Sequence, residues 1–486
     1  MNFNLVLLMP EIALTSAAGL AILVDAFSPR GLSRRFLLWI AGGGIAISAA
    51  LALRLLGTNT SAFNGAIAVD DYAVFFKLLF LAATLLVLLA ADTFMEETRH
   101  RAEFVGLLLL ATTGLMLLAA AMDLITLYIS IEISSLSIAF LSAWDKRGLR
   151  STEAGLKYFL LSAMSSAVLL YGMALLYGLT GHTRLDLIAT QIGQGPNAAL
   201  FLALAMLLAG FGFKVSAVPF QMWTPDVYEG APLPITAFLS VASKAAGFAA
   251  TVRVLQIALP TSQTDWTVLV AALAAATMTV GNIVALVQTN MKRMLAYSSI
   301  AQAGYVLVGV AAASQLGVSA VMFYLLAYTA TNLAAFIACI AIFNLTDSEQ
   351  IGDLRGLRWR SPWLAFALAV SLLSLAGLPP FVGFFAKLYV FWAAADRGLL
   401  WLVLVGVVNS AVSLYYYAQV IHDMYITGIG GGEPGVGDPV TTLGPRRPSP
   451  GLSTALTLAV IGVLVFGVLS GFFFGIGDVA ARTVAR

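Results

Sequence analysis

Residues 124–144 read LITLYISIEISSLSIAFLSAW, a stretch whose only charged side chain is Glu132. About 20 apolar residues are enough for an α-helix to cross the hydrocarbon core of a bilayer. A charged side chain at the centre of that core costs about 2.5–3.5 kcal/mol, so such residues are rare and usually functional. The stretch therefore predicts a membrane-spanning helix with a functional carboxylate at its middle.

The composition extends this prediction to the whole chain. Of its 486 residues, 60% are hydrophobic and only 10% are charged, and the mean hydropathy is +0.93. Average soluble chains carry about 25% charged residues. So few charges cannot cover the surface of a soluble globule, which disfavours a soluble enzyme, a disordered protein and a nucleic-acid binder. The net charge of +2 is too small to indicate an acidic polymer as partner.

Fourteen stretches are long and apolar enough to span a membrane, which predicts an all-α polytopic protein. The twelfth is too long for one straight span and contains Pro379-Pro380. The predicted spans are 4–24, 36–56, 72–91, 104–121, 124–143, 157–179, 198–218, 234–258, 266–288, 294–313, 318–344, 363–395, 399–424 and 452–476.

The basic residues predict the orientation of these spans. If the first span starts outside, the cytoplasmic loops hold sixteen Lys and Arg and the opposite face holds four, as the positive-inside rule requires. Both termini are then periplasmic and the number of spans is even. The sixteen are Arg30, Arg34, Arg35, Arg99, Arg101, Lys146, Arg147, Arg150, Lys157, Lys292, Arg293, Arg355, Arg358, Arg360, Arg446 and Arg447; the four are Arg184, Arg397, Arg482 and Arg486.

The remaining six basic residues lie within spans. Arg54, Lys77 and Arg253 lie near span ends, where we expect their long side chains to reach the interface. Lys214, Lys244 and Lys387 lie deep, and Glu11 is a weaker intramembrane candidate than Glu132. Burial disfavours the charged form of a lysine, so a deep lysine can take up and release protons.

These residues predict a proton relay in which Glu132 lies near Lys214 and holds it charged. The alternative is a set of buried salt bridges, which stabilise little. The serines around Glu132 either line water or, as the safer interpretation, pack helices. Asp226 and Glu229 either hold a loop or form a cytoplasmic proton inlet, and His422 with Asp423 is either an interfacial pair or a proton inlet or outlet.

A faint internal repeat divides the chain. Tyr128-Ile-Ser130 matches Tyr297-Ser-Ser299, Leu179-Thr180 matches Leu345-Thr346, and Lys214 and Lys387 are 173 residues apart, each beside a proline break. A five-helix unit repeated in tandem must be inverted in the membrane, an architecture typical of transporters. The predicted segments are 1–103 (helices 1–3), 104–258 (helices 4–8), 266–424 (helices 9–13, the inverted repeat), 425–451 (a cytoplasmic Gly/Pro-rich loop) and 452–486 (helix 14), with helices 7 and 12 broken.

The sequence also predicts that the chain carries no redox centre. Cys339 is its only cysteine and it has three histidines, which excludes a disulfide and a four-cysteine cluster and disfavours a bis-histidine haem. No Walker-type phosphate-binding motif occurs, which disfavours an ATP-driven pump.

Three motifs make the chain resemble the antiporter-like subunits of proton-pumping NADH:quinone oxidoreductase, respiratory complex I. They are FQMWTPDVYEGAP at 220–232 with LSVASK at 239–244, KRMLAYSSIA at 292–301, and LAGLPPFVGFFAKLY at 375–389. The resemblance covers essentially the whole chain. A lysine at position 387 and the lack of a long C-terminal lateral helix favour the subunit N group over subunits L and M.

The resemblance implies fourteen helices, two inverted five-helix repeats and a relay formed by Glu132, Lys214, Lys244 and Lys387. Gln221 and Gln302 stand where the family often has histidine. Glutamine forms hydrogen bonds but does not titrate. We therefore expect Gln221 and Gln302 to contact a water path without carrying the proton themselves. His422 and Asp423 are further candidates for a water path.

The resemblance further implies a multi-pass subunit of the bacterial inner membrane that binds no cofactor and no metal itself. NADH, FMN, iron–sulfur clusters and quinone are expected in partner subunits, and other membrane-arm subunits and lipid are expected neighbours. A subunit of a multi-subunit cation/proton antiporter is the alternative. The buried lysines disfavour a scaffold without an ion path. The absence of a mid-span substrate constellation beyond the charges disfavours an independent solute transporter.

Overall fold

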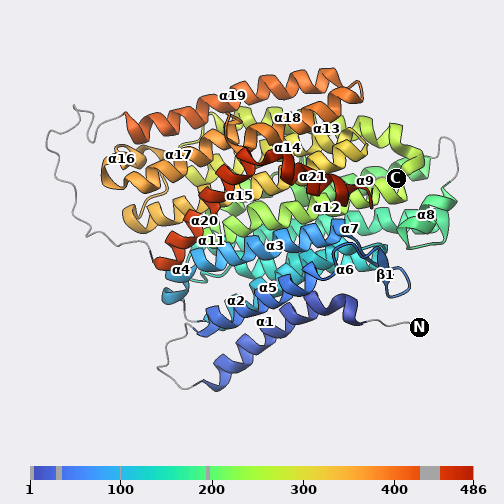
Figure 1. Cartoon of the computed structure of the whole chain (residues 1–486), viewed down its shortest axis with the longest axis horizontal. Coiled ribbons are helices and arrows are strands. Elements are labelled where there is room, and N and C mark those ends of the chain that lie inside the picture. The colour runs from blue at the N-terminus through green and yellow to red at the C-terminus, as the bar shows by residue number, and fades with distance from the viewer. Residues whose placement is uncertain (1–4, 29–35, 99, 193–197, 427–448, 485–486) are drawn as a thin grey trace.

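The structure, a computed structural model, describes residues 5–28, 36–98, 100–192, 198–426 and 449–484. It is a bundle of long helices lying side by side (Figure 1). Thirteen helices in these residues are long and apolar enough to cross a membrane. Two shorter apolar helices, α17 (Pro362–Ala376) and α18 (Val382–Asp396), fill the predicted twelfth span. The fourteen predicted spans are all present, which confirms the all-α polytopic fold.

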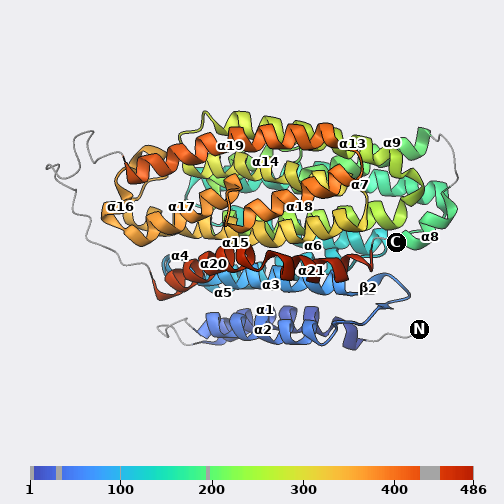
Figure 2. The same ribbon diagram turned by 45° about the horizontal axis from the view of Figure 1, so that its top comes forward.

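The first three spans form one edge of the bundle. Figure 2 shows α1 and α2 as a layer beneath the rest, and α1 packs on α2 and α5. A two-stranded antiparallel hairpin between α2 and α3 was not predicted from the sequence. The elements are η1 (Leu5–Leu8), α1 (Met9–Phe27), α2 (Phe36–Leu53), β1 (Thr60–Ala62), β2 (Ile67–Val69), α3 (Asp71–Ala90) and α4 (Asp92–Glu97).

The next five spans contain α6, which carries the stretch at 124–144, and a long buried segment that starts at α11. Two π-helical turns, η2 and η3, interrupt the eighth span. The elements are α5 (Arg101–Ala120), α6 (Leu124–Ser142), α7 (Leu149–Thr180), α8 (Leu185–Gln191), α9 (Ala198–Val215), α10 (Trp223–Gly230), α11 (Leu233–Phe238), η2 (Leu239–Ser243), α12 (Lys244–Arg253) and η3 (Val254–Ala258).

The remaining spans enclose α14 and α15, which are almost completely buried inside the bundle. The C-terminal helices α20 and α21 return to pack on α15 and α3. Besides α17 and α18, the elements are η4 (Pro260–Ser262), α13 (Gln263–Ala285), α14 (Met291–Ala311), α15 (Gln315–Thr346), η5 (Ile351–Leu354), α16 (Leu357–Arg360), α19 (Leu400–Tyr425), α20 (Pro450–Val468) and α21 (Ser470–Ala481).

The two ends of the bundle are distinct. The hairpin β1–β2, helix α8 and the end of α21 lie at one end, and α4 and α16 lie at the other (Figures 1 and 2). We call them the outer end and the inner end, after the predicted orientation, because those of the sixteen basic residues that the structure describes lie at the second. The Gly/Pro-rich loop predicted at 425–451 lies almost entirely outside the described residues.

Matching backbone contacts support the predicted inverted repeat. Asp123 and Asn290 cap α6 and α14 in the same way, each accepting from two backbone amides. Asp123 forms an antiparallel bridge with Arg184, and Asn290 forms one with Gln350. The two capping residues are 167 positions apart in the sequence, and their two bridge partners are 166 apart. Helices α7 and α15 both contain 32 residues and end at Thr180 and Thr346. The first set of contacts lies at the outer end and the second at the inner end, as inversion requires.

The two helix breaks also correspond, but the two lysines beside them do not. The amide of Phe220 donates to Ala217 after α9, and the amide of Phe381 donates to Leu378 after α17. This offset of 161 residues places Lys214 opposite Leu375, and Lys387 opposite Asp226. The predicted equivalence of Lys214 and Lys387 is therefore wrong, because one lysine precedes its break and the other follows it.

Two basic residues expected to reach the interface are instead buried. Lys77 on α3 is 2.7 Å from Glu11 on α1, and both side chains are almost fully buried. Arg253 on α12 binds both oxygens of Asp70, at 2.8 and 2.9 Å. Only Arg54 is exposed as predicted. Hydropathy places residues along a span but does not reveal an acidic partner on another helix, which is why the prediction failed.

Candidate functional site

Lys214 ends in a cluster of hydroxyl groups. It lies in the last turn of α9, and its Nζ donates to Ser135 Oγ at 2.8 Å, with Ser134 Oγ at 3.4 Å and Tyr158 OH at 3.5 Å. Its stem packs against Gly247 on α12, where an added Cβ would lie 3.1 Å from Lys214 Cγ. Glycine at that position therefore gives Lys214 room to lie against the helix that begins at Lys244.

Glu132 lies on the same helix as Ser135. Among the described residues, its carboxylate oxygens do not come within 4.0 Å of Lys214 Nζ, so the two side chains do not form an ion pair. The two groups are close enough to interact electrostatically. Glu132 Oε1 is buried without a hydrogen-bond partner among the described residues. The predicted proximity thus takes the form of an interaction through space, and serine hydroxyls make the direct contacts.

Lys244 contacts the second half of the chain directly. It is buried at the start of α12, right after the π-helical turn η2, and π-helical turns are frequent at functional sites. Its Nζ donates to the Ser299 carbonyl at 3.0 Å and to Ser299 Oγ, and it lies 5.7 Å from the centre of the Tyr228 ring. Tyr328 OH donates to the same Ser299 Oγ at 2.7 Å. Lys244 therefore joins the first half to α14 and α15.

Gln302 lies one turn beyond Ser299 on α14 and continues the polar contacts. Its Nε2 donates to the Leu375 carbonyl at 3.0 Å, and its Oε1 accepts from Tyr324 OH. Tyr417 OH lies 3.5 Å from the same Nε2 and also contacts Ser298. The structure thus places Gln302 between Lys244 and the end of α17, among polar side chains of the second half.

Lys387 follows the second break and turns back toward it. Its Nζ donates to the Ala376 carbonyl at 2.9 Å, at the C-terminal end of α17, and lies 4.5 Å from the centre of the Tyr305 ring. The C-terminal end of a helix carries partial negative charge, which stabilises a cation there. Among the described residues, none of Lys214, Lys244 and Lys387 has a carboxylate within 4.0 Å.

The other predicted water-path residues are more dispersed. Gln221 lies in the turn after the first break, and its Oε1 is buried without a partner among the described residues. His422 and Asp423 lie near the inner end of α19, with His422 Nδ1 3.7 Å from Asp423 Oδ1. Asp423 lines a cavity at the inner end, whereas Gln221 lies at the first helix break. The structure does not bring Gln221 together with this pair.

Asp226 and Glu229 connect three helices at the inner end. Asp226 binds Lys157 at 2.7 Å and Arg293 at 3.0 Å, and Arg293 also binds Glu229 at 2.7 Å. Burial alone would raise the pKa of Asp226, but hydrogen bonds from Lys157 and Arg293 outweigh it and lower the pKa from its ordinary value of 3.8. These contacts hold α10 against α7 and α14, which favours the interpretation that the two acids fasten this segment.

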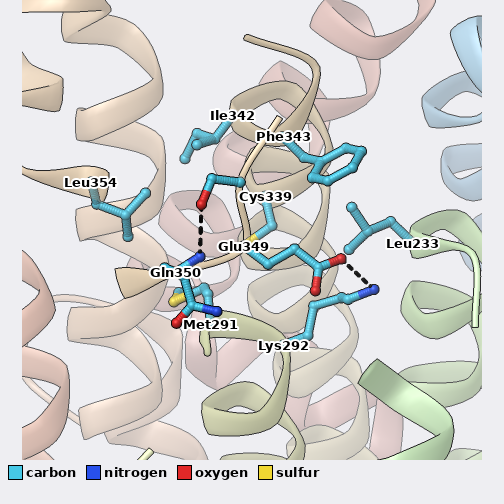
Figure 3. Close-up of a pocket in the computed structure, with 10 residues that line it drawn as sticks. Leu233, Met291, Lys292, Cys339, Ile342, Phe343, Glu349, Gln350 and Leu354 are labelled. Atoms are coloured by element: carbon cyan, nitrogen blue, oxygen red, sulfur yellow. Dashed lines mark hydrogen bonds and ion pairs between the residues drawn. The ribbon is translucent and has the colours of Figure 1, made fainter. Parts of the chain in front are cut away.

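A second inner-end cluster is shown in Figure 3. Lys292 Nζ lies 2.7 Å from Glu349 Oε1, beside the buried Cys339. The cavity they line has a volume of about 20 Å³, about enough for one water molecule. It is too small for an organic substrate. In the described residues no group of three or more His, Cys, Asp and Glu side chains could hold a metal ion.

The sequence predicted the lysines but not most of their partners. The sequence analysis did not predict four of the side chains that contact the lysines: Ser135, Tyr158, Ser299 and Tyr305. A sequence signal existed on α14, where the polar residues Ser299, Gln302 and Tyr305 recur at helical spacing. Broken helices and unpaired ionisable residues inside a bundle are features of ion-transporting membrane proteins. The fold and the site therefore define the class as a multi-pass membrane protein of transporter-like architecture.

Comparisons with known proteins identify the family. Residues 121–413 match the family described as NADH:quinone oxidoreductase/Mrp antiporter, transmembrane. NADH-quinone oxidoreductase subunit N of Trichlorobacter lovleyi is 45% identical over 87% of this chain and 88% of its own. The corresponding protein of Moorella thermoacetica is 43% identical over 96% of each chain. This chain belongs to the NADH:quinone oxidoreductase/Mrp antiporter membrane-subunit family.

Solved structures agree with this assignment. A chain of respiratory complex I from Thermus thermophilus is 33% identical and superposes with a TM-score of 0.79 over 96% of this chain and 99% of that one. A chain of an archaeal membrane-bound sulfane sulfur reductase superposes at 0.88 with 25% identity over 99% and 98%. A chain of the Mrp complex from Dietzia sp. DQ12-45-1b, at 22% identity and a TM-score of 0.86 over 100% and 98%, shares the fold.

Proposed function

We propose that this chain is the subunit N-type membrane subunit of a bacterial NADH:quinone oxidoreductase and moves protons without carrying out redox chemistry itself. The observation that carries the proposal is the succession of buried lysines and polar side chains from Lys214 through Lys244 and Gln302 to Lys387. A buried lysine with no counter-ion can be neutral and can accept a proton. Three such lysines in linked polar surroundings form a lateral relay.

In this relay the lysines act in turn. Glu132 favours the charged form of Lys214 by its negative charge, and a positive charge arriving at one lysine disfavours a charge on the next. Hydroxyl groups of Ser299, Tyr328 and Tyr324 and the amide of Gln302 orient water between Lys244 and Lys387. Gln302 hydrogen-bonds but does not titrate, so it positions and does not carry the proton.

The partner subunits supply the electron chemistry. NADH, FMN, iron–sulfur clusters and quinone bind there, and the relay in this chain is driven by quinone reduction elsewhere in the complex. The chain lies in the bacterial inner membrane with both termini in the periplasm, next to other membrane-arm subunits and lipid. This placement rests on the relatives named above and on the excess of basic residues at the inner end.

The alternative is a subunit of a cation/proton antiporter, which the shared fold with the Mrp complex favours. Purification of the tagged chain from its native membrane distinguishes the two. We expect NADH-oxidising and iron–sulfur subunits to co-purify. Recovery of the chain only with other polytopic antiporter subunits, and without NADH oxidation, would overturn the proposal.

Lys244→Ala tests the relay within the purified complex. We expect proton translocation and coupled quinone reduction to fall by about 100-fold, the scale of a lost proton-transfer group. Lys146→Ala is the control, because Lys146 lies exposed in an inner-end turn and contacts none of the three lysines. An assembled Lys244→Ala complex that pumps like the unaltered one would refute the relay.

A further inference from the structure

A polar cavity at the inner end lies outside the relay described above. It has a volume of about 430 Å³ and lies between the end of α13, η5 and the last turns of α19. Polar side chains form much of its wall, and one of them, Tyr416, is itself almost fully buried. The polar lining residues are Gln288, Thr289, Gln350, Arg355, Tyr416, Gln419 and Asp423.

A line of hydrogen bonds leads from this cavity into the bundle. Tyr416 OH donates to Asn282 Oδ1 at 3.0 Å, and Asn282 Nδ2 lies 3.3 Å from Tyr305 OH. The ring of Tyr305 lies under Lys387 Nζ, at 4.5 Å. Asn282 is fully buried in the last turn of α13. A buried amide costs free energy unless it is hydrogen-bonded. The three polar side chains therefore satisfy one another inside the bundle.

The amide of Asn282 separates two hydroxyl groups. A tyrosine hydroxyl can accept one proton and release another, but a side-chain amide hydrogen-bonds without titrating. With Asn282 bound to both Tyr416 and Tyr305, protons therefore cannot pass between them. Asn282 Nδ2 also donates to Asn409 Oδ1 at 3.3 Å and to the Met278 carbonyl at 2.9 Å, so the amide can release the Tyr305 hydroxyl and remain hydrogen-bonded.

We propose that α13, α14 and α19 form a proton access path from the inner-end cavity to Lys387, with Asn282 as its gate. The inference rests on the proposed function and adds to it the route by which Lys387 is reached. When the amide of Asn282 releases the two tyrosine hydroxyls and stays bound to Asn409 and the Met278 carbonyl, water fills the gap between those hydroxyls. A proton leaves water in the cavity, and each hydroxyl receives one proton and gives up another. Because Lys387 Nζ lies over the ring of Tyr305, a water molecule carries the proton released by the Tyr305 hydroxyl to the neutral Lys387 amine, which becomes an ammonium.

Substitutions of Asn282 test the gate in the whole complex reconstituted in vesicles. Asn282→Leu fills the gap with an apolar side chain, and we expect proton translocation to fall about tenfold or more. Asn282→Ser leaves room for water, so translocation should be retained or the passive proton leak should rise. A purely structural role predicts losses with both variants, and that result would overturn the gate.

Tyr416→Phe removes only a hydroxyl and tests the path by a change that leaves the packing in place. We expect translocation to fall about tenfold. Tyr415→Phe is the matched control, because Tyr415 is the preceding residue on α19 and its side chain is 65% exposed. Equal activities of the two variants would contradict the access path.

Lys387→Ala separates failure of this inference from failure of the proposed function. Combined with Asn282→Leu it should cause no loss beyond that of Lys387→Ala alone, because groups in one path are not additive. If Lys387→Ala pumps normally, the relay itself is wrong. If Lys387→Ala is inactive while Asn282→Leu and Tyr416→Phe are normal, only the access path is wrong.

Discussion

At the scale of single residues, the deep lysines are held by neutral partners. Lys214 binds serine and tyrosine hydroxyls, Lys244 binds Ser299, and Lys387 binds the Ala376 carbonyl. Elsewhere in the described residues, buried Lys77 and Arg253 each have a carboxylate. A paired charge is fixed, whereas a lysine with neutral partners can exchange its proton. The contrast separates residues that hold helices together from residues suited to a relay.

Ser135→Ala tests the direct contact of Lys214. The change removes the 2.8 Å hydrogen bond to Nζ, and a hydrogen bond to a charged group contributes about 1.5–3 kcal/mol. We expect coupled quinone reduction by the purified complex to slow about tenfold. Ser137→Ala is the control, since Ser137 Oγ bonds only the Ile133 carbonyl of its own helix among the described residues. Similar rates in both variants would show that Ser135 merely packs helices.

At the scale of elements, the broken helix α17–α18 depends on close backbone packing. Gly383 in the first turn of α18 lies against α17, where an added Cβ would be 1.8 Å from the Ser374 carbonyl oxygen. Only glycine allows this approach. The approach sets where Lys387, one turn further along α18, meets the end of α17.

Gly383→Ala should therefore disturb both stability and the site. Overpacking of this kind costs about 1–3 kcal/mol, and α18 must move away from α17, which carries Lys387 from the Ala376 carbonyl. We expect a lower unfolding temperature and weaker proton translocation. Gly471→Ala should leave both unchanged, because no atom lies within 4 Å of the Cβ it would add. Normal translocation by Gly383→Ala would show that this approach does not position Lys387.

The inner-end helix α10 depends on charge. The folded protein lowers the pKa of Asp226 below its ordinary value of 3.8, so the ionised form stabilises the fold. This contribution is complete above the unfolded pKa and is lost as pH falls through the lower folded pKa.

The unfolding temperature of the purified protein should consequently fall as pH is lowered below about 4. Asp226→Asn should reduce this dependence, because the side chain no longer titrates. Asp265→Asn, at the outer start of α13, should leave the dependence as it is, since no ion pair of Asp265 occurs among the described residues. An unchanged acid profile in Asp226→Asn would mean that Asp226 does not fasten α10.

At the scale of the whole molecule, α6 and α14 begin at opposite ends of the bundle, and the two predicted halves meet at Lys244. The capping contacts of α6 lie at the outer end and those of α14 at the inner end. The buried segment from α11 to η3 lies between them, and α20 and α21 close the bundle against α15 and α3. A lateral relay needs this arrangement, because it brings the lysines of both halves to the interior of one bundle.

Reporter fusions test the orientation. A reporter in 146–150 lies at the inner end and should be cytoplasmic, and one in 260–265 lies at the outer end and should be periplasmic, as should one after Arg486. The excess of basic residues at the inner end is the physical reason. A periplasmic reporter at 146–150 would refute the orientation and the count of spans together.

The sequence by itself determined the fourteen spans, the two breaks and the depth of Glu132, Lys214, Lys244 and Lys387. These are local properties: hydropathy over about 20 residues places a span, and proline removes a backbone donor wherever it occurs.

Only the tertiary structure decided what each of these residues touches. Lys77 with Glu11, Arg253 with Asp70, and Asn282 with Tyr416 join helices far apart in the sequence. Which faces of two helices meet depends on their rotation and packing, and hydropathy is nearly the same on every face of a buried helix. For the same reason the sequence wrongly paired Lys214 with Lys387, whereas the backbone contacts at the breaks set their true correspondence.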